Sequence, residues 1–514
     1  VVDAAITPGR CAAIPAAAYI ISVEADVSDG LPIFDLVGYL GSEVREAKQR
    51  VRISIKNSGF RLEPKRITIN LSPADIRKEG TAFDLPIAIA ILAAFGHIQQ
   101  ESLEDTLIIG EVSLNGDIKR VNGVLPIVYA AYKQGFKRCI VPESNKNEGA
   151  MVEGIDVYGV HSLKQLVKLL NEEIYLEPHF VDLYDKEDQK NDLEHLDFSD
   201  VVGQEIAKRG LEIAACGMHN ILMIGPPGSG KTMLAKRVPT IMPKLTIEES
   251  LNISKIYSIS GLLSNHQYLI RNRPFRSPHH TITSHALTGG GRIPVPGEIS
   301  LAHLGVLFLD ELPEFNRHTI ESLRQPLEEN QVTITRLQGS YTFPSDFMLV
   351  AAMNPCKCGY YPDRNKCNCS INEIRRYLGK ISRPLLDRID LSVETLPIHY
   401  KELEDKPKEE SSLSIGEKVT KARDMQLDRY KNENIFYNSQ LTSKMIPKYC
   451  KIGKEERNLL KYYYEKLELT ARAYHRILKV SRTIADLDQS EAILVKHISE
   501  AIRYRGMDKK FLES

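Results

Sequence analysis

One short segment constrains the fold of this chain more than any other. The sequence Gly225-Pro-Pro-Gly-Ser-Gly-Lys-Thr232 follows an apolar stretch at 220–224 and precedes a segment of helical character at 233–238. A strand, a glycine-rich turn and a helix in this order bring backbone amides and a helix N-terminus to one point, where they bind phosphate groups. The segment therefore predicts an α/β module that binds a nucleotide.

Each part of this loop has an expected role. Glycines let the backbone amides turn towards the phosphates, Lys231 reaches the β and γ phosphates, and the Thr232 hydroxyl binds Mg²⁺. We therefore expect ATP and Mg²⁺ as cofactors. The residues predicted to contact the nucleotide are Gly225, Pro226, Pro227, Gly228, Ser229, Gly230, Lys231 and Thr232.

Two further apolar segments each end in polar side chains. The segment 305–309 is followed by Asp310 and Glu311, and the segment 347–353 is followed by Asn354. We expect Asp310 to hold Mg²⁺ directly or through water, and Glu311 to polarise the attacking water as general base. Asn354 is expected to orient that water, although an Asn-Pro pair by itself is more often the start of a turn.

The composition fits a multidomain globular protein. With 514 residues, 42% of them hydrophobic and 26% charged, the chain is expected to form about two to four domains. Lys+Arg and Asp+Glu are equal at 67 each, so any attraction to nucleic acid depends on local basic patches. No apolar run is long enough to span a bilayer, and the apolar start is interrupted at 8–10, so we expect a soluble protein without a signal peptide.

The order of expected elements divides the chain into four parts, which makes the fold class α/β multidomain. Residues 1–171 predict an α+β domain, and the polar residues 172–198 predict a linker. Residues 199–400 hold the nucleotide module, and residues 401–514 open with a polar run to Ser414 and continue with helical periodicity. The expected strands are 19–25, 34–36, 66–71, 107–112, 138–141, 220–224, 306–309 and 347–352, and the expected helices are 83–95, 206–215, 454–467 and 472–486.

Four cysteines form two close pairs, Cys356 with Cys358 and Cys367 with Cys369. Four thiolates at this spacing can bind one tetrahedral zinc ion, although pairs with two residues between the cysteines are the commoner zinc spacing. Reduced free thiols and a redox pair are the alternatives. The chain has eight cysteines and does not look like a disulfide scaffold, which favours a reducing cytoplasm.

Several motifs together resemble one class of ATPase. The segments 200–204 and 382–390, the phosphate loop, Asp310-Glu311 and Asn354 resemble the AAA+ branch that contains magnesium-chelatase motor subunits and relatives of replicative helicases. The segments Arg276-Ser-Pro-His-His280, 289–291, 296–303 and 351–356 are similar to the bacterial ComM/YifB family, described as magnesium-chelatase-like. This resemblance covers nearly the whole chain.

The resemblance implies a homo-hexameric ring with ATP between subunits. Arg388 is the candidate arginine finger, with Arg383 second, and such an arginine neutralises transition-state charge only when the ring is assembled. Thr470-Ala-Arg472 resembles the sensor 2 motif of a helical lid, so that Arg472 would couple ATP contacts to lid movement, and Arg476 is its alternative. Without the resemblance, surface salt bridges would be the default for these arginines.

The first domain resembles the fold of Lon-type proteases through the segments 78–86 and 116–126. At the position of the protease's nucleophilic serine the chain has Ala82, and at the position of its general-base lysine it has Leu125. Thr81 is a neighbouring hydroxyl without a lysine. The resemblance therefore implies a binding or assembly module that lacks peptidase activity.

Two insertions carry basic residues and, in rings of this kind, would face the central pore. The first spans 271–292, and the second, 333–343, is expected to be a β-hairpin that turns at 338–340 and directs Arg336 inward. They would follow a phosphate backbone without reading its sequence, or else pack between subunits. The candidate DNA-binding residues are Arg276, His279, His280, Arg292 and Arg336.

The interpretation favoured by the resemblance is an ATP-dependent DNA translocase and helicase. Its expected task is branch migration of single-stranded or branched DNA in natural transformation, with recombination proteins among its partners. A magnesium-chelatase-like motor that acts with a partner subunit is one alternative. An ATP-switched protein remodeller or scaffold is the other, and stimulation of ATP hydrolysis by DNA, by a chelatase partner or by protein would distinguish the three.

Overall fold

The computed structural model describes residues 2–6, 18–184, 195–264, 267–292, 294–336, 339–397 and 409–511. The interrupted start at 8–10, the centre of the predicted linker at 185–194, the first turn residue of the predicted hairpin, Gln338, and the polar run at 401–408 lie outside these residues. Within the described chain, no helix combines the length and the apolar character needed to cross a bilayer.

The first body is built on a mixed seven-stranded sheet with the order β3-β4-β2-β1-β5-β8-β9. The strand β2 pairs antiparallel with β1 and β4, and the other pairs are parallel. The strands are β1 Val2–Ile6, β2 Tyr19–Ser28, β3 Phe34–Val37, β4 Arg66–Ser72, β5 Thr106–Ile108, β8 Arg138–Pro142 and β9 Asp156–Val160, with a small hairpin of β6 Glu111–Val112 and β7 Ile118–Lys119. The helices are α1 Ser42–Asn57, α2 Asp84–Ala94, α3 Val124–Lys133, α4 Lys146–Gly149 and α5 Leu163–Leu170.

The prediction of one continuous strand at 107–112 is wrong. The segment is divided into β5 and β6, because the chain leaves the sheet at Gly110, whose amide donates to the carbonyl of Ala82 and whose carbonyl accepts from the amide of Leu85. A Cβ on Gly110 would lie 3.0 Å from a methyl carbon of Leu85. The apolar α2 thus packs closely against this turn, and its apolar character on all sides is typical of a fully buried helix.

The second body contains a five-stranded parallel sheet with the order β11-β14-β17-β10-β18. The strands are β10 Ile221–Ile224, β11 Phe275–Arg276, β14 Val306–Leu309, β17 Met348–Met353 and β18 Leu391–Glu394, with hairpins β12 Gly289–Gly290 and β13 Val295–Pro296, and β15 Gln331–Arg336 and β16 Gly339–Pro344. The helices are α6 Glu205–Gly217, α7 Lys231–Ile241, α8 Ile247–Ile259, α9 Ser284–Thr288, α10 Glu298–Leu301, α11 Arg317–Glu321, α12 Pro326–Glu329, α13 Ile371–Leu378 and α14 Arg383–Leu386.

The order of these strands sets the position of the site. The carboxyl ends of β10, β14 and β17 meet at one edge of the sheet, because all three strands are parallel and adjacent. The phosphate loop, Asp310 and Asn354 directly follow these three ends. Ligands of open parallel sheets bind in this position.

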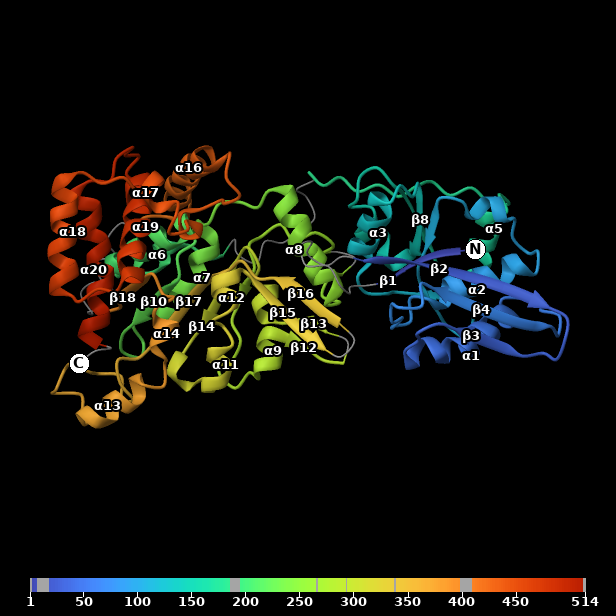
Figure 1. Ribbon diagram of the computed structural model, residues 1–514, viewed down its shortest axis with the longest axis horizontal. Coiled ribbons are helices and arrows are strands. Elements are labelled where there is room, and N and C mark those ends of the chain that lie inside the picture. Colours follow the sequence, from blue (N-terminus) through green and yellow to red (C-terminus); the bar gives the residue numbers. More distant parts are fainter. Residues whose placement is uncertain are drawn as a thin grey trace.

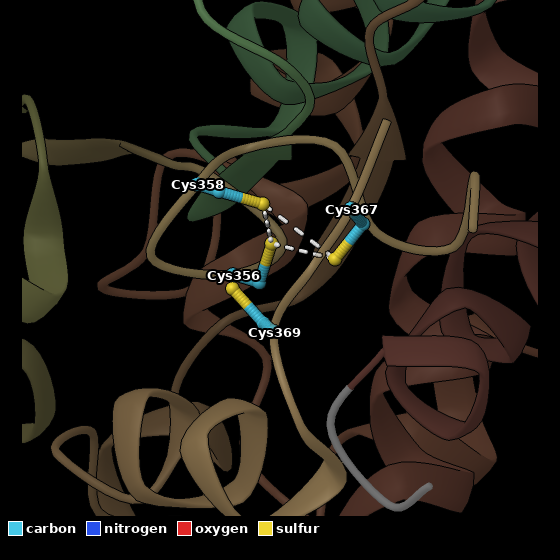
Figure 2. Close-up of side chains that lie close together, drawn as sticks. All are labelled: Cys356, Cys358, Cys367 and Cys369. Carbon is cyan, nitrogen blue, oxygen red and sulfur yellow. Dashed lines mark hydrogen bonds between the residues drawn. The ribbon is translucent and has the colours of Figure 1, made fainter. Parts of the chain in front are cut away.

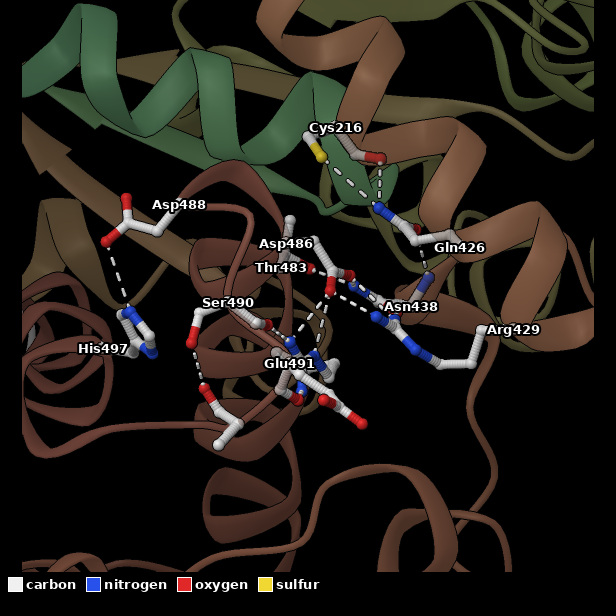
Figure 3. Close-up of polar contacts among 12 residues, drawn as sticks. Cys216, Gln426, Arg429, Asn438, Thr483, Asp486, Asp488, Ser490, Glu491 and His497 are labelled. Atoms are coloured by element: carbon white, nitrogen blue, oxygen red, sulfur yellow. Dashed lines mark hydrogen bonds and ion pairs between the residues drawn. The ribbon is translucent and has the colours of Figure 1, made fainter.

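Helices complete the chain and pack on the second body (Figure 1). They are α16 Ser412–Tyr430, α17 Ile446–Tyr449, α18 Lys454–Lys466, α19 Ala471–Leu487 and α20 Val495–Phe511. Figure 3 shows the polar contacts inside this group. The buried carboxylate of Asp486 accepts hydrogen bonds from Arg429 at 2.9 Å, Asn438 at 2.9 Å and Arg482 at 3.1 Å. These bonds satisfy the buried charge, and Gln426 extends the network to the end of α6 through the carbonyl of Cys216.

The helix α8 joins the two bodies, and Figure 1 shows it between them. Its residues Ile247 and Leu251 pack into a hydrophobic cluster formed by α3 and the strands of the first body. The amide of Gly123 donates to the carbonyl of Ser258 at 3.1 Å, and the Ser258 hydroxyl donates to the buried carboxylate of Glu148 at 2.5 Å. The first body is therefore fixed to the second through shared apolar surface and satisfied buried polar groups.

Candidate nucleotide site

The backbone of the phosphate loop requires glycine at three positions. Gly228 and Gly230 have φ angles of 77° and 86°, in the left-handed region that side chains with a Cβ disfavour. A Cβ on Gly225 would lie 2.1 Å from the Thr395 hydroxyl at the end of β18. The loop can therefore turn tightly above the sheet and end at the N-terminus of α7, where free backbone amides face an anion.

Lys231, the first residue of α7, is turned into the loop. Its ammonium group donates to the carbonyls of Gly225 and Pro226 at 2.8 Å each, and contacts the Asn354 side-chain oxygen at 3.3 Å. Burial lowers the pKa of Lys231, and the nearby carboxylates of Asp310 and Glu311 offset part of this effect. The structure thus brings the predicted lysine and the predicted water-orienting amide together.

The two predicted magnesium ligands are also in contact. The Thr232 hydroxyl donates to the Asp310 carboxylate at 2.7 Å, and the other oxygen of Asp310 accepts from the Glu311 amide at 2.9 Å. A hydroxyl and a carboxylate are hard oxygen ligands of the kind that Mg²⁺ prefers, so these residues fit that ion. Glu311 has a φ angle of 52°, an unfavourable conformation for a residue with a side chain. Its carboxylate is exposed at the same edge of the sheet.

Two further residues at this edge contact the nucleotide site in a way that the sequence analysis did not predict. His280, predicted as a DNA contact, has its Nδ1 atom 3.6 Å from the Glu311 carboxylate. Gln204 donates to the carbonyls of Ser229 at 3.2 Å and Leu396 at 2.5 Å, and thereby ties the phosphate loop to the end of β18. The segment 200–204, one of the motifs that resemble the AAA+ branch, was the sequence signal that linked Gln204 to the nucleotide module.

The predicted arginines lie at the opposite edge of the sheet. Arg388 and Arg472 line one cavity of about 450 Å³. Its wall includes Asn220, Phe347 and Asp390, the residues directly before β10, β17 and β18. Among the described residues, no hydrogen bond or ion pair joins either arginine to the phosphate loop. Arg472 is therefore separated by the sheet from the phosphate loop of its own chain.

Arg388 is held in place by a neighbouring carboxylate. It is buried, pairs with Glu328 and donates to the carbonyl of Arg324 at 3.2 Å. Arg383, the second candidate finger, is exposed. Arg476, the alternative to Arg472, pairs with Asp390 at 3.4 Å.

The four clustered cysteines follow Asn354 directly (Figure 2). Their Sγ atoms lie within 4.8 Å of one another, with Cys356 3.3 Å from Cys358 and 3.7 Å from Cys367. Sulfur atoms around a tetrahedral zinc ion are about 3.8 Å apart, so the cluster fits that ion. Burial raises the pKa of Cys358, but bonds from the Tyr360 amide and the neighbouring thiols outweigh it and lower that pKa to about 7.

The loop of the cysteine cluster also contacts the phosphate loop. Gly359, between the two cysteine pairs, has a φ angle of 89°. A Cβ at this position would lie 2.5 Å from the Cδ atom of Pro227. The turn that presents the cysteines is therefore one wall of the phosphate loop.

The five candidate DNA-binding residues have different surroundings. Arg276 forms two hydrogen bonds with Glu298, at 2.6 and 2.8 Å, and Arg292 pairs with Glu43 of α1 at 2.5 Å. His279 is exposed beside His280, with their ring centres 4.1 Å apart. Arg336 ends the first strand of the expected hairpin, which is present as β15 and β16. Arg276 and Arg292 are therefore paired within the chain, whereas the Arg336 guanidinium donates to the carbonyl of Gly291, next to Arg292, at 3.5 Å.

In the first body, the two residues compared with a protease nucleophile and base, Ala82 and Leu125, have apolar side chains. Leu125 is completely buried in α3, and Ala82 packs beside the same cluster. The Thr81 hydroxyl donates to the carboxylate of Glu111. The buried ammonium group of Lys78 donates to the carbonyl of Pro73, and among the described residues no lysine contacts Thr81.

The parallel sheet and the phosphate-loop edge together define an AAA+ nucleotide-binding module. Family models agree: "Magnesium chelatase, subunit ChlI" matches residues 197–403, "Subunit ChlI of Mg-chelatase" matches 23–145, and "Magnesium chelatase, subunit ChlI C-terminal" matches 409–505. The chain belongs to the ComM/YifB family of magnesium-chelatase-like AAA+ proteins.

The relatives on which this assignment rests cover nearly all of the chain. The competence protein ComM of Haemophilus influenzae is 42% identical over 494 residues, which are 95% of each chain. The protein YifB of Escherichia coli is 43% identical over 492 residues, 95% of this chain and 94% of that protein. A magnesium-chelatase 67 kDa subunit of Chlorobaculum parvum is 25% identical over 206 residues, 39% of this chain and 27% of that protein.

Proposed function

We propose that this protein is an ATP-hydrolysing ring motor whose active sites form between neighbouring copies. The observation that carries this proposal is the position of the site residues on two opposite edges of one sheet. Lys231, Thr232 and Asp310 lie at the carboxyl edge, whereas Arg388 lies at the amino edge. A head-to-tail arrangement brings the second edge of one copy to the first edge of the next, and repeats into a closed ring if the rotation closes.

Each residue then has a defined task. Lys231 and the loop amides bind the phosphates, Thr232 and Asp310 hold Mg²⁺, and Glu311 accepts the proton of the attacking water. The bound ion supplies charge neutralisation at the phosphates. From the neighbouring copy, Arg388 stabilises charge at the γ phosphate, and Arg472 reaches the same nucleotide because it shares a cavity with Arg388. The carboxy-terminal helices that carry Arg472 act as the lid.

We further propose that the ring is a homo-hexamer in the cytoplasm that moves on single-stranded or branched DNA. Its task is branch migration during natural transformation, together with recombination proteins. The name of the competence protein from H. influenzae supports the competence setting. The hairpin that carries Arg336 supports a backbone contact, and the first body is a Lon-like binding or assembly module without peptidase activity.

The deciding experiment is steady-state ATP hydrolysis by the purified protein with and without single-stranded and branched DNA. We expect DNA to stimulate hydrolysis, and the Glu311→Gln variant to show no stimulated hydrolysis. Hydrolysis that stays the same with every DNA tested would contradict the DNA motor.

A second candidate function is a chelatase-like motor. It is favoured by the magnesium-chelatase family models, which match residues in the first body, in the second body and in the carboxy-terminal helices. In that case hydrolysis would respond to a chelatase partner subunit and would not respond to DNA.

We also propose that the four clustered cysteines bind one structural zinc ion that supports the phosphate loop. Cys367→Ser is expected to remove about one equivalent of zinc per chain and to raise the KM for ATP, because the turn with Gly359 rests on Pro227. Cys450→Ala, at a buried cysteine outside the cluster, should keep the metal. Elemental analysis and ATP titration measure both effects, and a zinc-free wild-type protein would refute the proposal.

A further inference from the structure

The segment 172–184 is not a free tether in its described part. It lies extended along the first body beyond β9, where the His179 amide donates to the carbonyl of Val157 at 2.8 Å. Leu183 is buried in the cluster around α3, and Val181 and Leu176 pack against the core from the same segment. We call the residues 172–184 the strap.

The outward face of the strap alternates aromatic and acidic side chains. Tyr175, Phe180 and Tyr184 are 82%, 77% and 73% exposed. Between and before them the exposed residues are Glu172, Glu173, Glu177 and Asp182. Three almost fully exposed aromatic rings on one short segment are unusual for a surface that faces only water.

A cavity of complementary character lies on the same body. It has a volume of about 780 Å³ and is formed by the end of α1, the start of β3 and the loop before β4. Its apolar lining includes Phe34, Phe60 and Leu62, and its basic lining consists of Arg52, Lys56, Arg61 and Lys65, with Glu63 as an opposing charge.

Most of these basic groups have no acidic partner within the part of the chain that the structure describes. Lys65 pairs with Asp29 at 3.7 Å and with Glu63 at 3.4 Å. Among the described residues, no ion pair joins Arg52, Lys56 or Arg61 to a carboxylate. The cavity therefore combines apolar surface with free positive charge, the opposite of the outward face of the strap.

The strap and the cavity lie at opposite edges of one sheet. The strap runs beside β9 and the cavity lies beside β3, and these are the two edge strands of the order β3-β4-β2-β1-β5-β8-β9. One copy therefore cannot fill its own cavity by a local movement of its strap. A second copy can, and this contact is head-to-tail, the same type as the proposed ATP site.

We propose that the strap of one copy docks into the cavity of the next, with Tyr175, Phe180 or Tyr184 in the apolar pocket and the acidic residues on Arg52 and Lys56. The contact rests on the proposed ring, to which it adds an interface in the first body. Because α8 fixes the first body to the ATPase body, the rotation that relates neighbouring copies at the ATP site also relates them at this interface. The apolar lining favours a peptide over DNA. Single-stranded DNA would need aromatic side chains on which its bases stack and a continuous groove of basic residues along its backbone.

Binding of a peptide tests the contact without a ring and without ATP. The probe is a fluorescein-labelled peptide with the sequence of residues 171–184. It is titrated by anisotropy into full-length protein that carries Tyr175→Ser, Phe180→Ser and Tyr184→Ser, so that the strap of another copy does not compete. We expect saturable binding that weakens at least about tenfold with Arg52→Glu and Lys56→Glu on α1. Lys164→Glu and Lys168→Glu, the same spacing on exposed positions of α5, should leave the affinity unchanged.

Each other outcome overturns the proposal. The peptide does not dock in the cavity if its binding is not saturable, or if the variant with Arg52→Glu and Lys56→Glu binds it with unchanged affinity. Equal affinity for a peptide of shuffled sequence shows a general acceptor of acidic peptides, and displacement by a single-stranded oligonucleotide shows a DNA surface. ATP hydrolysis by the unaltered protein is measured separately and involves neither the peptide nor these variants, so failure of the strap contact is distinguishable from failure of the motor.

Charge exchange in the full chain tests the contact between copies. Arg52→Glu with Lys56→Glu, and separately Glu173→Lys with Glu177→Lys, should each shift sedimentation velocity towards smaller species, and the four substitutions combined should restore assembly. Thermal unfolding of each variant verifies the fold. Unchanged assembly of both partial variants, or no recovery in the combination, would refute the interface.

Discussion

Arg388→Ala is expected to lower ATP hydrolysis by about 10³–10⁵-fold, the range for an arginine finger supplied by a neighbour. Nucleotide binding should remain, because Arg388 lies at the amino edge of the sheet, away from its own phosphate loop. Hydrolysis and ATP titration measure the two effects separately. Arg383→Ala is the matched control, and a loss with this variant instead would make Arg383 the finger.

Mixing two inactive chains tests whether the site is shared. Lys231→Ala removes the phosphate contact, and Arg388→Ala removes the finger. An interface between one chain of each kind is complete when the Arg388→Ala chain supplies Lys231 and the Lys231→Ala chain supplies Arg388, which is one of the two possible arrangements. Random assembly in equal amounts should therefore recover hydrolysis at about a quarter of the interfaces. No recovery, with assembly verified by sedimentation, would show that both residues act within one chain and would contradict a site shared between copies. Unfolding temperatures are a necessary check, since Arg388 is buried against Glu328.

Glu311→Gln is expected to lower hydrolysis by about 10²–10⁴-fold, because an amide cannot accept the proton of the attacking water. The change keeps the size of the side chain, and ATP should still raise the unfolding temperature, since Lys231, Thr232 and Asp310 remain in contact with one another or with the loop. Single-turnover hydrolysis measures the loss.

Glu314→Gln is the control for this substitution. Glu314 belongs to the same loop but pairs with Lys380 at 3.1 Å, so its loss should change hydrolysis little. Equal losses with both variants would show a general effect of charge at this edge and would contradict the general-base role of Glu311.

The carboxyl edge of the sheet was predictable because its constraints are local. Gly228 and Gly230, the strand before the loop and the carboxylates after β14 are each defined by neighbours in sequence, whereas Gly225 is constrained by the distant Thr395. Thr232 and Asp310 meet because β10 and β14 run parallel on either side of β17, so that their carboxyl ends lie at one edge of the sheet. For the same reason, most of the expected strands and helices are present with bounds shifted by a few residues.

Features that depend on distant partners were not predictable. Arg276 and Arg292 were candidate DNA contacts because they are basic residues in an insertion. Their ion pairs with Glu298 and Glu43 could not be predicted, because these partners lie elsewhere in the sequence. The pairing of His280 with Glu311 requires β11 and β14 to be neighbours, which only the fold shows. The polar composition of 172–198 predicted a linker, although the part at 172–184 packs on the first body. Its alternation of inward apolar and outward aromatic residues was hidden among acidic residues.

The junction at α8 determines how this protein can be divided. Because Ile247 and Leu251 pack with α3, an ATPase fragment that begins near residue 199 would expose an apolar strip to water. It would also leave Glu148 and Gly123, the hydrogen-bond partners of Ser258, on the discarded piece. A shortened chain of this kind is therefore a poor substitute for the whole protein, and loss of activity on truncation would report damage to the junction as much as a task of the missing part.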